Sequence, residues 1–178
     1  MTDISVRALR EDEWAQYRSV RLAALKESPH AFVASFEQES ALTEVEWRER
    51  MRRSTRLLAE RDGEVVGVVS LGEAENRPEQ VAELFGLWVM PSARGAGVAW
   101  GLVQAGADHA RSQGRTHVSY WVGTDNGRAV AFASSFGFRP TDSRRPMRVA
   151  SEADGEEELA MTLPLGADPG SAPTSRRS

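Results

Sequence analysis

The spacing of apolar and polar residues predicts a chain that alternates between strands and amphipathic helices. Ile4 to Leu9 alternates apolar with polar residues, which is typical of a half-buried strand. Glu11 to Lys26 and Thr43 to Arg53 instead carry apolar residues at helical spacing. Thr55 to Glu60 and Glu64 to Leu71 are rich in strand-forming residues. The first part of the chain is therefore predicted to form a strand, two helices and two further strands.

The Asp62-Gly63 pair between the last two strands indicates a tight hairpin. The later elements are expected as strands at Val81 to Met90 and Thr116 to Val122, helices at Val98 to Gln113 and Gly127 to Phe136, a strand after Gly137-Phe138, and a last strand at Glu157 to Leu163. The polar stretch 141–155 is expected to connect the last two strands. The order β-α-α-β-β-β-α-β-α-β-β predicts an α/β (α+β) domain whose mixed sheet has helices on both faces.

Length and composition favour one globular domain. The chain has 178 residues, 40% of them hydrophobic and 27% charged, and we expect residues 1–165 to form a single domain and residues 166–178 to be a disordered tail. Because no long apolar run occurs and charges are scattered through the first twenty residues, we expect neither a membrane span nor a signal peptide, and therefore a cytoplasmic location.

Charge and residue usage exclude some chemistry. The net charge of −4 argues against nucleic acid as a partner and is compatible with a cationic acceptor. The chain has no cysteine, which excludes disulfides, a cysteine nucleophile and thiolate metal sites. His30, His109 and His117 lack the spacing of metal ligands, so we expect no metal site.

A glycine-rich turn stands between a predicted strand and a predicted helix. Leu87-Trp88-Val89-Met90-Pro91 ends the strand, and Arg94-Gly95-Ala96-Gly97-Val98-Ala99 leads into the helix. Glycine lets the backbone approach a ligand closely, and the first amides of a helix are unpaired at the positive end of its dipole. This arrangement indicates a phosphate site, to which Arg94 can add a charge-assisted contact.

Two other phosphate-binding patterns fit this turn poorly. A Walker loop requires Gly-Lys-Ser/Thr, which is absent, and a dinucleotide fingerprint requires a third glycine and a position near the start of the chain. Here Gly95-Ala96-Gly97 lies in the middle of the chain and is followed by Trp100. The structural alternative is that the glycines only form a tight turn.

Two motifs together resemble the GNAT acetyltransferase superfamily. Arg94, Gly97 and Ala99 match its motif A, Gln/Arg-x-x-Gly-x-Gly/Ala. About 30 residues later, Asn126, Ala129, Phe132 and Gly137-Phe138 resemble its motif B, Asn-x-x-Ala-x-x-Leu-Tyr-x-x-x-Gly-Phe. The two motifs in this order are more specific than either alone. The resemblance implies the GNAT acyl-CoA N-acyltransferase fold, with a mostly antiparallel sheet and a splayed pair of strands.

The resemblance also implies acetyl-CoA (coenzyme A) as cofactor. The amides of Arg94 through Ala99 would hold the pyrophosphate, and the pantetheine arm would lie where the fourth and fifth strands separate near Gly86 to Val89. The implied cofactor-binding residues are Leu87, Trp88, Val89, Arg94, Gly95, Ala96, Gly97, Val98, Ala99, Asn126, Ala129 and Phe132. For Asn126, the structural alternative is a plain N-cap of the next helix.

The implied reaction is acetyl transfer to a primary amine by direct attack within a ternary complex. Where motif B often has a proton-donating tyrosine, this chain has Ala133. General acids contribute about 10²–10⁴-fold, but a thiol with a pKa of about 8.5 leaves readily, so we expect a smaller penalty. Ser134, Tyr120 or a water could supply the proton. Glu83 is the candidate general base, with a pKa raised by burial, unless it faces solvent or only orients the acceptor.

The resemblance leaves the acceptor and the activity open. The expected acceptors are a small amine or amino acid first, a protein N-terminus of the ribosomal-protein type second, and an aminoglycoside-type antibiotic third. Because Ala133 replaces the tyrosine, a non-catalytic coenzyme A-binding regulatory module is the alternative to an active acetyltransferase. Homodimers are common in the family, so a homodimer is a further expectation.

Overall fold

The computed structural model of the chain describes residues 3–146 and 157–166. Most of the predicted tail 166–178 and the second half of the predicted connection 141–155 lie outside the described residues.

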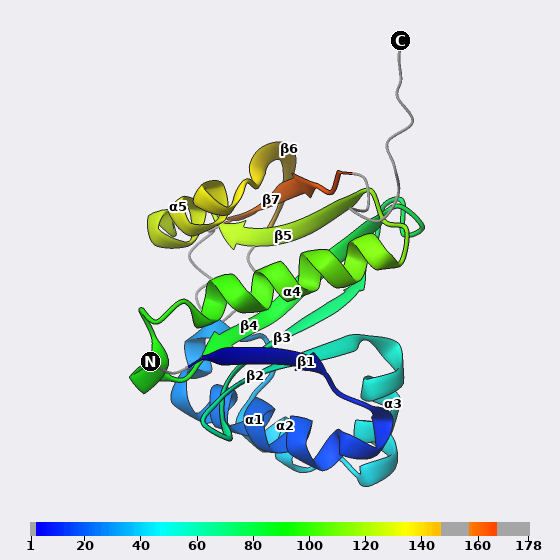
Figure 1. Ribbon diagram of the computed structural model, residues 1–178, viewed down its shortest axis with the longest axis vertical. Coiled ribbons are helices and arrows are strands. Elements are labelled where there is room, and N and C mark those ends of the chain that lie inside the picture. Colours follow the sequence, from blue (N-terminus) through cyan, green and yellow to red (C-terminus); the bar gives the residue numbers. More distant parts are fainter. Residues whose placement is uncertain (1–2, 147–156, 167–178) are drawn as a thin grey trace.

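One sheet of seven strands runs through the molecule in the order β1-β2-β3-β4-β5-β7-β6 (Figure 1). The strands are β1 (Ile4–Ala8), β2 (Thr55–Arg61), β3 (Glu64–Glu73), β4 (Val81–Val89), β5 (His117–Gly123), β6 (Arg139–Pro146) and β7 (Glu157–Pro164). Every neighbouring pair is antiparallel except β4 and β5, which are parallel. This pattern confirms the mixed, mostly antiparallel sheet that the sequence predicts.

Helices cover both faces of the sheet, as predicted (Figure 1). They are α1 (Trp14–Glu27), α2 (Phe36–Ser40), α3 (Glu44–Arg53), α4 (Val98–Ser112) and α5 (Gly127–Phe136), with short 3₁₀ turns at Glu11–Glu13, Pro29–Ala31 and Pro91–Ala93. Leu57 packs in the core cluster formed with α4, while its neighbour Leu58 packs in the cluster formed with α1 and α3. Successive strand residues point to opposite faces, so the sheet is buried on both sides.

Two elements differ from the prediction. The short helix α2 was not predicted; Ser35 begins it with a capping box, in which the Ser35 side chain accepts a hydrogen bond from the Gln38 amide. Residues 141–146 belong to β6 and are not a connection. This strand lies at the sheet edge and is exposed at most positions, so it lacks the apolar alternation that reveals a buried strand.

The sheet opens between β4 and β5. Their pairing runs from Val81 opposite His117 to Leu84 opposite Tyr120 and stops there. On the other side of β4, the register with β3 shifts between Val68 and Ser70, so that Gly86 and Leu87 together oppose Val69. This is a β-bulge, and Gly86 has the positive φ of 66° that glycine adopts without strain. A bulge bends its strand, which accounts for the separation of β4 from β5 just beyond Leu84.

Candidate active site at the separated strands

The turn before α4 depends on glycine backbone geometry. After β4, a 3₁₀ turn at Pro91–Ala93 leads to Gly97, the N-cap of α4, which has a left-handed conformation with φ 85° and ψ 8°. Gly95 likewise has φ 84°. This conformation costs about 1–2 kcal/mol for a residue with a Cβ atom. The sequence therefore places glycine where the chain must turn from the strand into the helix.

The first turn of α4 presents unpaired amides. Gly97 has no side chain to cap the helix, and the first backbone bond within it runs from the Gly101 amide to the Gly97 carbonyl oxygen, 3.0 Å away. The amides of Val98, Ala99 and Trp100 therefore have no partner within the helix. They border a cavity of about 390 Å³ lined by Val89, Ala93, Arg94, Gly95, Gly97, Val98, Ala99, Trp100 and Phe132. An anion fits this cavity because it lies at the positive end of the helix dipole.

The end of β4 directs main-chain groups into the opening between the strands. The Met90 amide donates to the Val66 carbonyl oxygen on β3, 2.8 Å away. Since neighbouring residues of an antiparallel strand alternate in direction, the polar groups of Val89 face the other way, toward β5. The Val89 carbonyl oxygen accepts a hydrogen bond from Arg94 Nε at 2.9 Å. An extended ligand in the opening can therefore pair with the edge of β4.

Arg94 and Trp88 both contact Glu27 of α1. Trp88 is buried, and its indole N–H donates to Glu27 Oε1 at 3.0 Å, so this side chain packs beneath α1. Arg94 Nη2 reaches the same oxygen at 2.9 Å. Hydrogen bonds from Ser28 and Trp88 hold the pKa of Glu27 below its usual range. Glu27 thereby ties the glycine-rich turn to α1, a contact that sequence reasoning did not predict.

Helix α5 begins with Asn126 as its N-cap, the structural alternative for this residue. The Asn126 side chain accepts a hydrogen bond from the Ala129 amide at 3.1 Å, so the capping role left open for Asn126 is present. Phe132 faces the cavity at α4 and makes an edge contact with Trp100. Ala133 is fully buried. Ser134 is exposed and lines neither this cavity nor the one described next.

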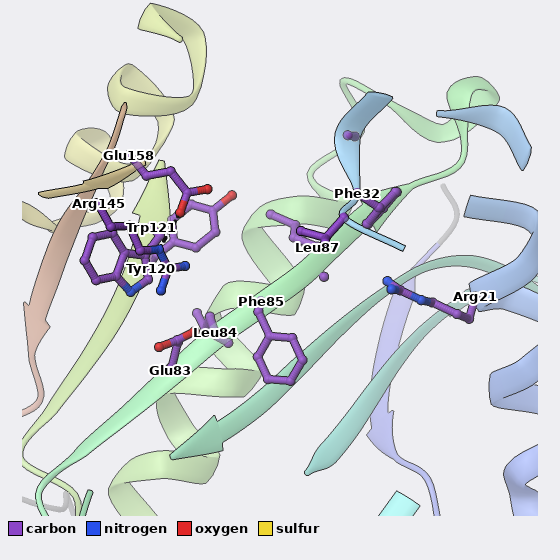
Figure 2. A pocket seen from close by; sticks show the side chains of 13 residues that line it. Arg21, Phe32, Glu83, Leu84, Phe85, Leu87, Tyr120, Trp121, Arg145 and Glu158 are labelled. Carbon is purple, nitrogen blue, oxygen red and sulfur yellow. Dashed lines mark hydrogen bonds and ion pairs between the residues drawn. The ribbon is translucent and has the colours of Figure 1, made fainter. Parts of the chain in front are cut away.

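A second cavity of about 280 Å³ lies where β4 and β5 separate (Figure 2). Its walls include residues 83–87 of β4, Tyr120 and Trp121 of β5, and Arg21 and Phe32 from the helical side. The predicted catalytic residues Glu83 and Tyr120 and the predicted cofactor residue Leu87 thus meet in one cavity. Burial raises the pKa of the Tyr120 hydroxyl, which keeps the proton on this group at neutral pH.

An ion pair between Arg145 and Glu158, which sequence reasoning did not predict, lies in one wall of this cavity. Arg145 of β6 lies over the Trp121 ring, 4.0 Å from its centroid, and forms a 2.6 Å ion pair with Glu158 of β7. Figure 2 shows these side chains together, with the Glu83 carboxylate pointing toward them. The sequence pattern places residue 145 in a connection, and only the pairing of β6 with β7 brings Arg145 to Glu158.

Fold and site together define the class of the protein. A mixed sheet opened between two parallel strands, with a glycine turn and a bare helix N-terminus at the opening, is the arrangement expected of an acyl-CoA-dependent N-acyltransferase. The sequence model of the acetyltransferase (GNAT) family matches residues 6–138, and the chain belongs to this family.

Sequence relatives match the chain over part of their length. An uncharacterised N-acetyltransferase of Methanocaldococcus jannaschii is 33% identical over 86 residues, which are 46% of this chain and 37% of the relative. A mycothiol acetyltransferase of Sanguibacter keddieii is 36% identical over 85 residues, 46% of this chain and 27% of the relative. The matches thus span about a third of the length of these relatives.

Solved structures share the whole fold. A putative acetyltransferase of Salmonella typhimurium, solved with its cofactor acetyl-CoA, has a TM-score of 0.68 at 19% identity and covers 97% of this chain and 99% of its own. A GNAT-family acetyltransferase of Streptococcus pneumoniae has a TM-score of 0.75 at 17% identity, covering 92% and 100%. A ribosomal-protein-alanine N-acetyltransferase of Brucella melitensis has a TM-score of 0.69 at 22% identity, covering 90% and 99%. These likenesses confirm the predicted fold.

Proposed function

We propose that the protein transfers the acetyl group of acetyl-CoA to a primary amine by direct attack in a ternary complex. One observation carries this proposal: the bare N-terminus of α4 and the cavity holding Glu83 and Tyr120 border the same opening between β4 and β5. A thioester laid along the β4 edge would have its diphosphate at one end and, at the other, the cavity that holds Glu83 and Tyr120, which we call the acceptor cavity. The Salmonella protein of the same fold, which was solved with acetyl-CoA, supports this cofactor.

The residues present fit the cofactor. The amides of Val98, Ala99 and Trp100 would hold the diphosphate, and the Val89 main chain would pair with the pantetheine arm. Phe132 and Ala129 would border the arm from α5. Arg94 would add positive charge while bonded to Val89 and Glu27. Bound here, acetyl-CoA supplies the acetyl group as a thioester.

Glu83 and Tyr120, both in the acceptor cavity, carry out the proton transfers. An alkyl ammonium with a pKa of about 10.4 must lose a proton, which costs roughly 4 kcal/mol at pH 7.4. Glu83 accepts this proton, directly or through water. The amine nitrogen then bonds to the acetyl carbon as the carbon–sulfur bond breaks, and the Val89 amide polarises the acetyl oxygen. Tyr120, which its burial keeps protonated, donates a proton to the departing sulfur in place of the missing motif B tyrosine, and the second proton that the acetylated nitrogen loses returns through water to the Tyr120 oxygen.

A second candidate function is a coenzyme A-binding regulatory module without catalysis. It is favoured by Ala133, a buried residue whose methyl side chain cannot donate a proton at the position on α5 where motif B often has tyrosine. A protein N-terminal acetyltransferase of the ribosomal-protein type is the third candidate, and its support is the likeness in fold to the Brucella enzyme.

The cytoplasmic location and the homodimer stay predictions; in the part of the chain that the structure describes, no helix is long and apolar enough to span a membrane.

Thiol release from acetyl-CoA in the presence of a panel of amines, amino acids and peptides tests the proposal. We expect turnover with at least one acceptor class and a loss of turnover in Glu83→Gln at neutral pH that higher pH partly restores, because the amine then deprotonates unaided. Tight acetyl-CoA binding without turnover on any acceptor would favour the regulatory module. Absence of both binding and turnover would contradict each of the three candidates.

A further inference from the structure

Four of the eight residues that line a third cavity, of about 370 Å³, are arginines. We call it the arginine cavity; it is lined by Arg21, Arg50, Arg53 and Arg56 together with Tyr17, Glu39, Ser54 and Phe85. Four guanidinium groups thus face one carboxylate, in a chain whose net charge is −4. The local excess of positive charge runs against the overall charge, which indicates a site for an anion.

The one lining carboxylate is already fully engaged. Glu39 is buried and receives two hydrogen bonds from Arg21, at 2.9 and 3.2 Å, and an ion pair from Arg50 at 3.0 Å. Although burial opposes the shift, the two guanidinium groups hold the pKa of Glu39 below its usual range, so it is charged at neutral pH. Glu39 therefore supplies one negative charge that Arg21 and Arg50 share, and the four arginines of the cavity keep a net positive charge.

Arg56 is a buried cation without an anionic partner among the described residues. Arg56 is only 5% exposed to solvent. One terminal nitrogen donates to Ser70 Oγ at 2.6 Å, the other donates to the Arg50 carbonyl oxygen at 3.0 Å, and Nε has no partner in the described part of the chain. The Tyr17 ring lies 4.7 Å from the guanidinium carbon and compensates part of the charge. Burial lowers the pKa of Arg56, a sign that its charge is poorly compensated.

The arginine cavity adjoins the acceptor cavity. Arg21 and Phe85 line both cavities, and Figure 2 shows Phe85 standing between Glu83 and Arg21. The Arg21 guanidinium also lies over the Phe32 ring of the acceptor cavity, 4.9 Å from its centroid. Ser70, which binds Arg56, pairs with Phe85 in the β3–β4 register. One elongated ligand can therefore place an amine near Glu83 and its other end among the arginines.

We propose that the acceptor is an anionic amine, whose carboxylate or phosphate group is held by Arg53 and Arg56 in the arginine cavity. This inference rests on the proposed acetyltransferase function. The planar fork of a guanidinium matches the paired oxygens of either group. Substrates of this class include amino acids and amino-alkyl phosphates, whereas polyamines and aminoglycosides are repelled by the net positive charge of the arginine cavity.

A series of ω-amino carboxylates, from glycine to longer chains, tests the proposal against the primary amides of the same acids. The amides keep the shape and remove the charge. We expect kcat/KM to favour the carboxylate over its amide by about tenfold or more at the best chain length. A parallel series of amino-alkyl phosphates distinguishes the two oxyanions: preference for either over the neutral amide supports the proposal. Equal use of acids, phosphates and amides would overturn it.

Variants of neighbouring arginines supply the matched comparison. Arg53→Gln should reduce the preference for the anionic acceptor about tenfold, mainly through KM, because Arg53 is exposed and its loss leaves the fold intact. Arg56→Gln should do the same, with unfolding monitored because Arg56 is buried. Arg52→Gln is the control, since Arg52 pairs with Glu11 outside the arginine cavity at 2.7 Å. An unchanged preference in Arg53→Gln and in folded Arg56→Gln would refute the assignment.

A binding measurement separates this inference from the proposed function. Calorimetry of the N-acetylated ω-amino acid and of its amide needs no turnover. Tighter binding of the anionic compound to the wild-type protein, and loss of that difference in Arg53→Gln, would support the anion site even if no acetyl transfer occurred. Normal acetyl transfer to neutral amines, with equal binding of both compounds, would overturn the anion site and leave the acetyltransferase function standing.

Discussion

Ala99 offers a way to remove diphosphate binding without damaging the fold. It occupies the second position of α4, behind the Gly97 N-cap, and it lines the cavity at the helix N-terminus. In Ala99→Asp a carboxylate would stand where the diphosphate is expected. A negative charge in the first turn stabilises a helix by about 0.3–1 kcal/mol, so the variant should unfold no more easily than the wild type.

The expected loss of affinity follows from the charges involved. Two unit charges about 4 Å apart interact by about 4 kcal/mol at the effective dielectric constant of a protein surface. Ala99 is only partly buried, and screening should reduce this to about 2 kcal/mol, or roughly 30-fold in Kd. The control Ala99→Asn has nearly the same shape as Ala99→Asp and no charge, so it should bind coenzyme A up to about 30-fold better than Ala99→Asp.

Calorimetric titration with coenzyme A at low and high salt, together with thermal unfolding, checks this prediction. The difference between the Asp and Asn variants should shrink as salt is raised. If folded Ala99→Asp bound coenzyme A as tightly as the wild type, the diphosphate would have to lie elsewhere than at the start of α4.

Three further predictions concern stability and catalysis. Glu39→Gln should lower the free energy of unfolding by about 2–3 kcal/mol at pH 7, since it leaves Arg21 and Arg50 unpaired in a partly buried site. Because folding lowers the pKa of Glu39, its contribution to stability is present above the unfolded pKa of about 4.3 and disappears as the pH falls through the lower folded pKa. The free energy of unfolding, measured by denaturant titration at acidic pH, should therefore fall less steeply with decreasing pH in Glu39→Gln than in the wild type. Equal slopes would contradict this. Gly67→Ala should lower the free energy of unfolding by about 1–3 kcal/mol, because the added Cβ would lie 2.9 Å from the Trp88 carbonyl oxygen and 3.1 Å from Val98 Cγ1. In the control Gly101→Ala the nearest contact of the added Cβ is 3.9 Å, so thermal unfolding should show a gain in stability of about 0.5–1 kcal/mol. Tyr120→Phe should lower kcat by up to about 10²-fold while Ser134→Ala leaves it unchanged; the reverse result in steady-state assays would make Ser134 the proton donor.

Local structure was predicted correctly where one short sequence pattern determines it. The Asp62-Gly63 turn, the glycines before α4 and the Asn126 cap each act through their own backbone geometry, so they could be located from neighbouring residues alone. Buried strands and helices could also be located, because the spacing of their apolar residues shows which face of the element is buried. The edge strand β6 is exposed at most positions and lacks this apolar spacing, so residues 141–146 were wrongly assigned to a connection.

Contacts between distant elements could not be predicted. The arginine cavity gathers side chains from α1, α2, α3, β2 and β4, and no spacing along the chain relates Arg21 to Arg56. The contact of Trp88 and Arg94 with Glu27 likewise joins positions 61 and 67 residues apart. These contacts depend on how helices lie on the sheet, which a single sequence does not specify.

The most direct test compares the binding of acetyl-CoA and of S-acetylpantetheine to the wild-type protein by calorimetry. Both carry the acetyl thioester and the pantetheine arm, but the second lacks the diphosphate and the nucleoside. If the start of α4 binds the diphosphate, acetyl-CoA should bind at one site per chain with an affinity that falls as salt rises, and the truncated thioester should bind far more weakly. Equal affinities for the two thioesters, or no heat from either, would contradict the account.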